Sequence, residues 1–584
     1  MSGGQMELEA FNFLRDWLGN SDRFFWGLFT FQCSGRLHVV SMRSFSISKL
    51  HPGWPSLMFT FVFLWVTHRC YAAPPVISSA VKSSIRTRVD YQYSPSMVVG
   101  MVNADGRSFY GYGQTAYDSN RTPDEHTVYE IGSISKVLTT SLLADLWLSG
   151  EVNLDDPVET YLPEGVNVPA RNGIEITLED LATHFSGLPT NPETIFENDS
   201  TNPFFPFDDQ DLYDYLNKHT LARRPGQSFE YSNLGMGLLG HALALGQNQS
   251  FESLIKDRLF KPLNMNETTI TWDESKNDQR AVGYSGVVER PFFKMESLES
   301  AGSVLSTVND LLTFAEHQMD LKDSPLNQAF KQAHKKRVNI GSPGTDLGLG
   351  WFILSNVPSP ILMHDGATLG HNSFIGIDIA NKTAVVVLAN ARVNAYSGVQ
   401  NIGIHLLVPQ APLSSIRRPV DLETEHLQSI YGTYQNEDDS TVNIGLEHDH
   451  LTVEFSEDTG THYTFYPLSS RRFMFYEATI EASATFQFDE DDKPIELTWR
   501  QSGQSTSYQR VTRPAHLRLL AQSDSIQLDI DEGDGATAYD IQASGDFVAW
   551  TSLGPLTLWD APMDLDPETP YQFFRAVATE VGDE

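Results

Sequence analysis

A serine and a lysine three residues apart could supply a nucleophile and its base. Ser133 and Lys136 stand at the start of a stretch, residues 137–146, whose apolar side chains have helical spacing and predict a helix. Because residues three apart on a helix share a face, the hydroxyl and the amine would lie together. A serine hydroxyl needs such a base, and the unpaired N–H groups at a helix start favour a developing oxyanion. This is the chemistry of the S-x-x-K motif.

The S-x-x-K spacing alone is weak, because the chain repeats it at residues 46–49, 79–82 and 253–256. The copy at Ser133 is distinguished from these repeats by two further motifs that follow it in the chain.

The second motif contains Tyr231 and Asn233, separated by one serine. In an extended loop these two side chains would project the same way. A phenol can relay a proton if nearby positive charge lowers its pKa, and an amide can bond both the lysine and a substrate. Y-x-N also recurs at residues 215–217 and 434–436, so this motif too is weak by itself.

The third motif begins at His364 and continues through Asp365, Gly366 and Ala367. It precedes two predicted strands, at residues 374–378 and 384–390. A glycine in a strand lets a substrate backbone approach closely, and the N–H of Ala367 could then donate to an oxyanion. Loss of one such donor typically costs about 3–4 kcal/mol.

The three motifs in this order resemble the serine β-lactamase-like superfamily, in its class C β-lactamase, D,D-peptidase and esterase branch. The resemblance covers about residues 80–410 and extends to residues 181–189 and 301–310. It implies an α+β catalytic domain, in which an antiparallel sheet is flanked by helices and accompanied by a helical subdomain. It also implies acyl transfer to serine followed by hydrolysis, with no metal and no organic cofactor.

The resemblance assigns a role to each motif residue. Ser133 is implied as the nucleophile and Lys136 as its proton acceptor, with Tyr231 as general base and acid. Asn233 is implied as an orienting residue, and His364 takes the third-motif position. On the substrate strand at Gly366 and Ala367, the N–H of Ala367 and that of Ser133 are implied as the oxyanion hole.

A neutral Lys136 is a condition of this mechanism. The pKa of free lysine is near 10.4, so a neutral amine at pH 7 requires a shift of about three units, or about 4 kcal/mol. Burial and a neighbouring cation could supply that shift. If the amine stays charged, Tyr231 has to carry the proton alone.

The chain departs from class C β-lactamases at His364 and Asp365, where those enzymes have lysine and threonine. A mostly neutral ring recognises a substrate carboxylate weakly, and Asp365 would repel one. We therefore expect a small peptide of the D-amino-acid type or an ester as substrate. Hydrolysis of β-lactams, as in a penicillin-binding protein relative, is one alternative. A non-catalytic surface or binding protein that retains the fold is another.

The composition excludes several classes of partner. The chain of 584 residues carries 75 acidic and 40 basic residues, a formal charge of −35, which repels nucleic acid and anionic lipid. Its length suggests two to four domains. The only cysteines, Cys33 and Cys70, precede the first predicted domain, so disulfides cannot hold that domain together. The sequence sets no oligomeric state.

The beginning of the chain has the pattern of a targeting segment. Residues 42–72 read as a signal peptide, with an apolar run at 57–66 that is too short to span a bilayer and a small-x-small site ending at Ala72. Residues 1–41 are an extension that suggests a mis-assigned start. We expect a secreted or periplasmic protein, with membrane contact only through an uncleaved leader.

Two all-β domains are predicted after the catalytic domain. Residues 420–512 contain short alternating segments, beginning at residues 427–434, that resemble a small lipocalin-like barrel. Its role is either structural or to shape access to the active site. Residues 514–584 are strongly acidic and resemble a fibronectin type III-like β-sandwich, with strands expected at 526–530, 538–544 and 571–577.

Overall fold

The computed structural model divides the chain into two compact units, Met1–Pro74 and Pro75–Glu584. It describes residues 28–33, 36–41, 70–71, 73–197, 202–392, 398–456, 463–477, 480–511, 516–521, 526–532, 538–544, 551–556, 563–565 and 573–579. The first unit contains a three-stranded sheet of β1 (Leu28–Cys33), β2 (Arg36–Ser41) and β3 (Cys70–Tyr71). Apart from β3, the predicted signal peptide lies outside the described residues.

The predicted catalytic domain is built on an eight-stranded antiparallel sheet. Strands from both ends of the domain form it, because β4 pairs with β15. In spatial order the strands are β10 (Val338–Asn339), β11 (Thr345–Leu347), β12 (Phe352–Leu354), β13 (Ile361–Ala367), β14 (Asn372–Asp378), β15 (Thr383–Ala389), β4 (Ser96–Asn103) and β5 (Gly106–Gly113).

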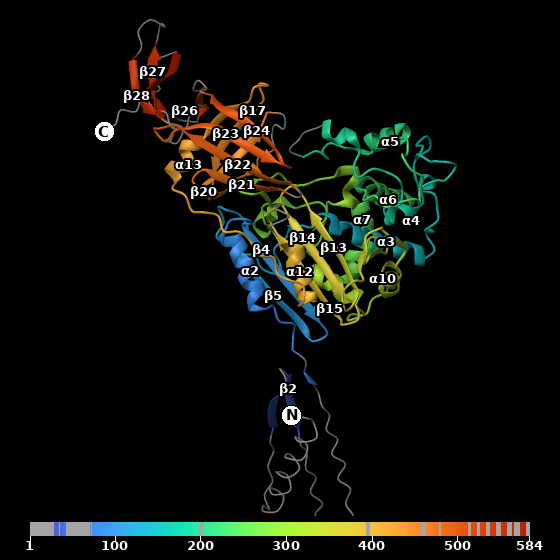
Figure 1. Ribbon diagram of the computed structural model, residues 1–584. Coiled ribbons are helices and arrows are strands. Elements are labelled where there is room, and N and C mark those ends of the chain that lie inside the picture. Colours follow the sequence, from blue (N-terminus) through green and yellow to red (C-terminus); the bar gives the residue numbers. More distant parts are fainter. Residues whose placement is uncertain are drawn as a thin grey trace, which may run out of the picture. The chain divides into compact units, whose positions relative to one another are not determined.

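Alternation along the strands divides the core into two layers. On β4, Val98 and Val102 belong to the larger cluster, whereas Met97, Val99 and Met101 belong to the smaller one. The smaller cluster packs under α2 (Ser79–Asp90) and α12 (Val399–Leu407), and the larger one extends into the helical region. Figure 1 shows α2 and α12 beside the sheet, with the helical region gathered on the other side.

The helical region contains α3, whose nearly all-round apolar surface explains its place inside the core. A capping box between Thr177 and Asp180 begins α4, as the sequence predicts. The helices are α3 (Ser135–Leu148), α4 (Leu178–Ala182), α5 (Asp209–Lys218), α6 (Asn233–Gly246), α7 (Phe251–Ile255), α8 (Lys261–Leu263), α9 (Val308–Gln318) and α10 (Asn327–Ala333). The predicted α+β fold class is confirmed.

A nine-stranded antiparallel sheet forms the next domain and nearly closes into a barrel. Its order is β19 (Tyr463–Thr464), β18 (His450–Phe455), β17 (Thr441–Glu447), β16 (Gly432–Gln435), β24 (Gln504–Val511), β23 (Pro494–Gln501), β22 (Ile480–Phe488), β21 (Arg472–Glu477) and β20 (Tyr466–Ser469). One prediction is wrong. Residues 427–430 belong to α13 (Thr424–Ile430) rather than a strand, because Leu427 and Ile430 are three apart and cover the barrel core.

The tail contains two three-stranded sheets in its described residues. One has the order β25 (His516–Ala521), β26 (Ile526–Glu532), β29 (Met563–Leu565), and the other β28 (Thr551–Leu556), β27 (Ala538–Ser544), β30 (Phe573–Thr579). All-β structure is thus present where it was predicted. Among the residues that the structure describes, no helix has the length and apolar character needed to cross a membrane.

Candidate active site

Ser133 lies in a short 3-10 turn, Gly132–Ile134, that leads directly into α3. The sequence predicted that Ser133 would open the α-helix itself, and the helix in fact begins two residues later. The spacing still brings the two side chains together. The Lys136 amine donates to the Ser133 hydroxyl at 2.9 Å and to the carbonyl oxygen of Ala301 at 2.7 Å.

Burial sets the protonation of Lys136. The side chain is fully buried, and this desolvation lowers the pKa of Lys136 to about 7. The nearby carboxylate of Asp365 acts in the opposite direction. The neighbouring cation that we expected makes no contribution among the described residues, so burial alone produces the shift.

Tyr231 contacts both Ser133 and Lys136. Its phenol is hydrogen-bonded to Ser133, and the Lys136 amine lies 4.9 Å from the centre of its ring. Burial raises the pKa of Tyr231 above its ordinary value, and the hydrogen bond from Ser133 offsets this only in part. The lowered phenol pKa that we expected is therefore not what this site produces, and Tyr231 is a neutral phenol at pH 7.

Asn233 is placed differently from the prediction. It is the first residue of α6, with Ser232 as the N-cap, and so does not continue an extended loop. Its amide donates to the side-chain oxygen of Asn191 at 2.9 Å rather than to Lys136. The cap explains this, since the Ser232 hydroxyl accepts from Gly235 N and turns the chain into the helix.

His184 packs against Tyr231 and bonds the loop that carries it. It is 1% exposed, and its Nδ1 accepts a hydrogen bond from Ser232 N at 3.1 Å. Its ring lies 4.6 Å from that of Tyr231. Burial, with smaller effects of Lys136 and His364, lowers the pKa of His184 well below its ordinary value. A neutral histidine therefore supports the loop that carries the phenol.

His364, on β13, is also buried and neutral. Its Nδ1 lies 2.6 Å from the carbonyl oxygen of Asp365, and its ring centre lies 6.3 Å from that of Tyr231. Burial lowers the pKa of His364 to about 4. Among the described residues its Nε2 has no hydrogen-bond partner.

The turn before Ser133 packs tightly against the third motif. Gly132 has φ +50°, and a Cβ on it would lie 2.8 Å from Ala367 N. A Cβ on Gly366 would lie 2.1 Å from the carbonyl oxygen of Ile131 and 3.0 Å from Ser133 N. Two glycines thus allow the segments that carry the Ser133 and Ala367 N–H groups to approach each other.

A pocket of about 590 Å³ opens onto this arrangement. It is lined by Ser133, Tyr231, Phe352, Asp365, Gly366, Ala367, Asn372, Ser373, Gly398, Val399, Gln400 and Asn401. No lysine or arginine is among these described lining residues, and Asp365 is exposed. The pocket therefore offers a carboxylate but no basic side chain to a ligand.

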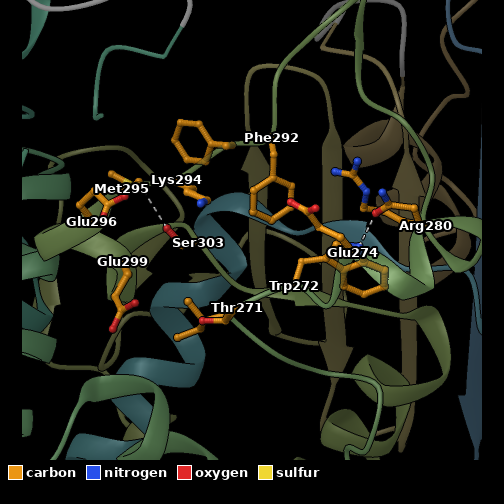
Figure 2. A pocket seen from close by; sticks show the side chains of 13 residues that line it. Thr271, Trp272, Glu274, Arg280, Phe292, Lys294, Met295, Glu296, Glu299 and Ser303 are labelled. Carbon is orange, nitrogen blue, oxygen red and sulfur yellow. Dashed lines mark hydrogen bonds between the residues drawn. The ribbon is translucent and has the colours of Figure 1, made fainter. Parts of the chain in front are cut away.

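A second pocket, of about 330 Å³, contains none of the predicted site residues. Trp272, Phe292 and Arg280 line it, and Figure 2 shows them opposite Met295 and Ser303. The Arg280 guanidinium lies 5.2 Å from the centre of the Phe292 ring. Within the described part of the chain, no group of three or more His, Cys, Asp or Glu residues could hold a metal ion.

Comparison with protein families identifies the family of the domain that contains this site. The family model described as Beta-lactamase matches residues 81–408, more than half of the chain. The chain therefore belongs to the beta-lactamase family.

Individual relatives match the same region. The D-alanyl-D-alanine-carboxypeptidase/endopeptidase AmpH of Escherichia coli K12 is 29% identical over 305 residues, which is 49% of this chain and 77% of that protein. Protein flp of Staphylococcus aureus MW2 is 29% identical over 322 residues, or 53% of this chain and 63% of that protein. The solved structure of a beta-lactamase/D-alanine carboxypeptidase from Yersinia pestis shares the fold, with TM-score 0.50, 21% identity and coverage of 56% of this chain and 99% of its own.

Proposed function

We propose that this protein is a serine hydrolase that forms an acyl-enzyme at Ser133 and acts on peptides of the D-amino-acid type or on esters. The observation that carries the proposal is the 2.9 Å contact between the Ser133 hydroxyl and a buried Lys136 whose pKa is about 7. An amine that is about half neutral at pH 7 can accept the hydroxyl proton, which an ordinary lysine cannot.

The reaction has two steps. In the first, Ser133 Oγ attacks the substrate carbonyl carbon while its proton moves to the neutral Lys136 amine. The N–H groups of Ser133 and Ala367 receive the oxyanion. The bond to the leaving group then breaks, and that group takes a proton through the Tyr231 phenol, which Lys136 reprotonates. In the second step water attacks the ester carbonyl carbon, and a proton from the water passes to Tyr231 and Lys136. The bond between that carbon and Ser133 Oγ then breaks, and Oγ takes up the proton.

The charge in the pocket favours one kind of substrate. Asp365 lines the pocket together with Ser133, and the described lining residues include no basic side chain. A carboxylate bound there would meet repulsion with no compensating cation. AmpH is named for carboxypeptidase and endopeptidase activities, and only the second needs no terminal carboxylate. Interior peptide bonds, amides and esters are therefore the favoured substrates, ahead of β-lactams.

The nucleophile can be tested with an ester or fluorophosphonate probe. The probe should label the unaltered protein, and Ser133→Ala should abolish labelling. Ser253→Ala, which alters another S-x-x-K copy, is the matched control and should label fully. Labelling that survives in Ser133→Ala would end the catalytic assignment and leave the non-catalytic binding protein as the better account.

The substrate preference needs a panel of compounds of matched size. We expect turnover of acyl esters and D-amino-acid amides, and weak turnover of a chromogenic cephalosporin. Asp365→Asn should raise kcat/KM for a carboxylate-bearing ester about 5- to 20-fold relative to kcat/KM for a neutral ester, consistent with removing one charge at the pocket surface. The ratio is the readout, because loss of the carboxylate also lowers the pKa of Lys136 for both substrates. A carboxylate ester that is already the best substrate of the unaltered protein would contradict the preference.

We also propose that the protein is exported, on the basis of the leader pattern at residues 42–72. Fractionation and N-terminal sequencing of the mature protein test this. A chain that stays inside the cell with residues 42–72 attached would contradict export.

A further inference from the structure

Glu130 and His371 form a buried pair that the proposed reaction does not use. The side chains are 5% and 1% exposed, and His371 Nδ1 lies 3.2 Å from a Glu130 carboxylate oxygen. The other ring nitrogen, Nε2, lies 3.3 Å from the carbonyl oxygen of Ala281. A carbonyl oxygen can only accept, so Nε2 carries a proton. With Nδ1 facing the carboxylate, the ring bridges Glu130 and the Ala281 carbonyl oxygen.

The contacts of Glu130 keep its carboxyl group ionised. Burial alone would raise the pKa of Glu130, but the charge of His371 and hydrogen bonds from His371, Thr368 and the backbone of Phe293 hold it below its ordinary value. Glu130 is therefore a carboxylate at neutral pH. A buried pair of this kind is weak evidence for stability. The reason for the Glu130–His371 pair therefore has to lie in its position in the fold.

The pair joins the two segments that carry the proposed oxyanion donors. Glu130 lies in β6 (Tyr129–Glu130), three residues before Ser133. His371 lies in the turn between β13 and β14, four residues after Ala367. Thr368 closes this turn, since its N–H donates to the His371 carbonyl oxygen at 3.0 Å and its hydroxyl accepts from His371 N at 3.0 Å.

A second hydrogen bond strengthens the same connection. The Ser373 hydroxyl on β14 donates to the carbonyl oxygen of Ile131 at 2.7 Å. Ile131 lies between Glu130 and the 3-10 turn of Ser133. The turn before the nucleophile is therefore held to the β13–β14 hairpin at two adjacent residues, Glu130 and Ile131.

Glu130 also contacts the segment 293–303, which contains the carbonyl group that accepts a hydrogen bond from Lys136. Its other carboxylate oxygen accepts from Phe293 N at 3.1 Å. Phe293 lines the pocket of about 330 Å³, as does Ser303. The Ser303 hydroxyl accepts from Met295 N at 3.0 Å, and Figure 2 shows these two residues joined by that bond. The segment between them includes Ala301, whose carbonyl oxygen accepts from the Lys136 amine.

We propose that the Glu130–His371 contact is a positioning device that sets the distance between the oxyanion donors of Ser133 and Ala367. The inference rests on the proposed function, because it presupposes an oxyanion at that place. Loss of the contact on either side would let the hairpin and the nucleophile turn move apart. Misplacement of reacting groups by about 1 Å costs on the order of 100-fold in rate.

The test compares an ester with its thionoester, in which sulfur replaces the carbonyl oxygen. Sulfur accepts hydrogen bonds weakly, so the thionoester depends little on the oxyanion donors. Glu130→Gln should lower kcat for the ester about 10- to 100-fold, which is less than the roughly 100- to 1000-fold loss seen when an oxyanion donor is removed outright, with KM changed less than 3-fold. The thionoester should lose less than 3-fold. His371→Gln should give the same pattern.

Arg107→Gln is the matched control. It removes another partly buried ion pair, Arg107–Glu316, whose side chains are 18% and 11% exposed and which joins β5 to α9. This variant should lose stability but keep both rates. If Glu130→Gln lowers the ester and thionoester rates equally, or lowers neither, the positioning role is wrong.

A measurement on the unaltered protein covers the case in which the variants do not fold. Nitrogen-15 NMR should show a proton on His371 Nε2 that exchanges slowly with water, as the contact with the Ala281 carbonyl oxygen requires, and an Nε2 without a proton overturns the proposal. Failure of the proposed function is a separate result, seen as ester turnover that persists in Ser133→Ala.

Discussion

Lys136 is the residue whose environment most directly sets activity. Its amine is enclosed by protein, with the Ser133 hydroxyl and the Ala301 carbonyl oxygen as its hydrogen-bond partners. The low pKa that makes it a base is thus a direct result of removing it from water. The same burial has one consequence for the rate and another for stability.

The rate should depend on pH through this amine. Because Lys136 accepts a proton only when neutral, kcat/KM for a neutral ester should rise as pH increases through about 7 and then level off. His364, with a pKa of about 4, is already neutral across this range and should not contribute. A rate profile on a substrate without ionisable groups measures this. A rise centred near pH 4 to 5 would identify a different base.

Replacement of Lys136 should abolish activity and increase the stability of the fold. The lowered pKa means that the folded protein binds fewer protons than the unfolded chain between pH 7 and 10.5. The cost of burying the amine is therefore present in full below about pH 7 and decreases as pH rises towards 10.5. At pH 7, Lys136→Met should abolish turnover yet raise the free energy of unfolding by about 2 kcal/mol, after loss of the two hydrogen bonds. Urea unfolding measures this, and a less stable variant would contradict it.

At the scale of elements, the two glycines of the site have a structural task. Gly132 has a positive φ, and a Cβ there would meet Ala367 N and O within 3 Å. Gly132→Ala should therefore lower kcat at least about 100-fold, as expected when an oxyanion donor is displaced. Gly150, after the other end of α3, has φ +77° and nothing within 4 Å of an added Cβ.

Gly150→Ala is thus the control for backbone strain alone. It should cost about 1 kcal/mol of stability and leave kcat unchanged. Equal effects of the two substitutions on kcat would show that the close approach at Gly132 does not matter. Steady-state kinetics with thermal unfolding of both variants makes the comparison.

Local patterns were enough to predict most elements. Apolar alternation and an Asp-Gly turn are local signs of β4 and β5, and the Thr177–Asp180 spacing is a local sign of α4. The helix α13 was missed because residues 427–434 contain apolar side chains at spacings that suit both a strand and a short helix. Strand β24 carries a weak signal, because most of its side chains are polar and exposed.

The site was predictable in part. The S-x-x-K spacing was sufficient to place Ser133 beside Lys136, because both belong to one turn of chain. The Asn233 contact and the support of Tyr231 by His184 depend on how separate loops pack, and no local pattern reports that. The same holds for Glu130 and His371, which are 241 residues apart in the sequence.

At the scale of the whole second unit, the barrel is fixed to the catalytic domain by buried aromatic residues. Tyr466 on β20 is 1% exposed, and its ring centre lies 4.5 Å from that of Tyr93, which is fully buried beside β4. The Tyr466 hydroxyl donates to the carbonyl oxygen of Gln92 at 3.3 Å. His448 stacks on Tyr117, with ring centres 4.8 Å apart. The barrel therefore contributes to the stability of its neighbour.

Tyr466→Ala tests this coupling. Loss of a buried aromatic ring should lower the free energy of unfolding by about 3–5 kcal/mol, and the unfolding transition of the catalytic domain should shift with that of the barrel. Phe473→Ala, inside the barrel core, is the control and should affect mainly the barrel transition. Calorimetry that shows an unchanged catalytic transition in Tyr466→Ala would contradict the coupling.

The order of the nine barrel strands has a practical consequence. The first strand, β16, pairs with the last, β24, so that Thr433 lies opposite Val511. The polypeptide thus enters and leaves this domain at one place. A domain whose two ends lie together can be inserted into another protein with little disturbance of its host. A reporter protein fused after residue 511 would begin beside β16, where the chain enters the barrel.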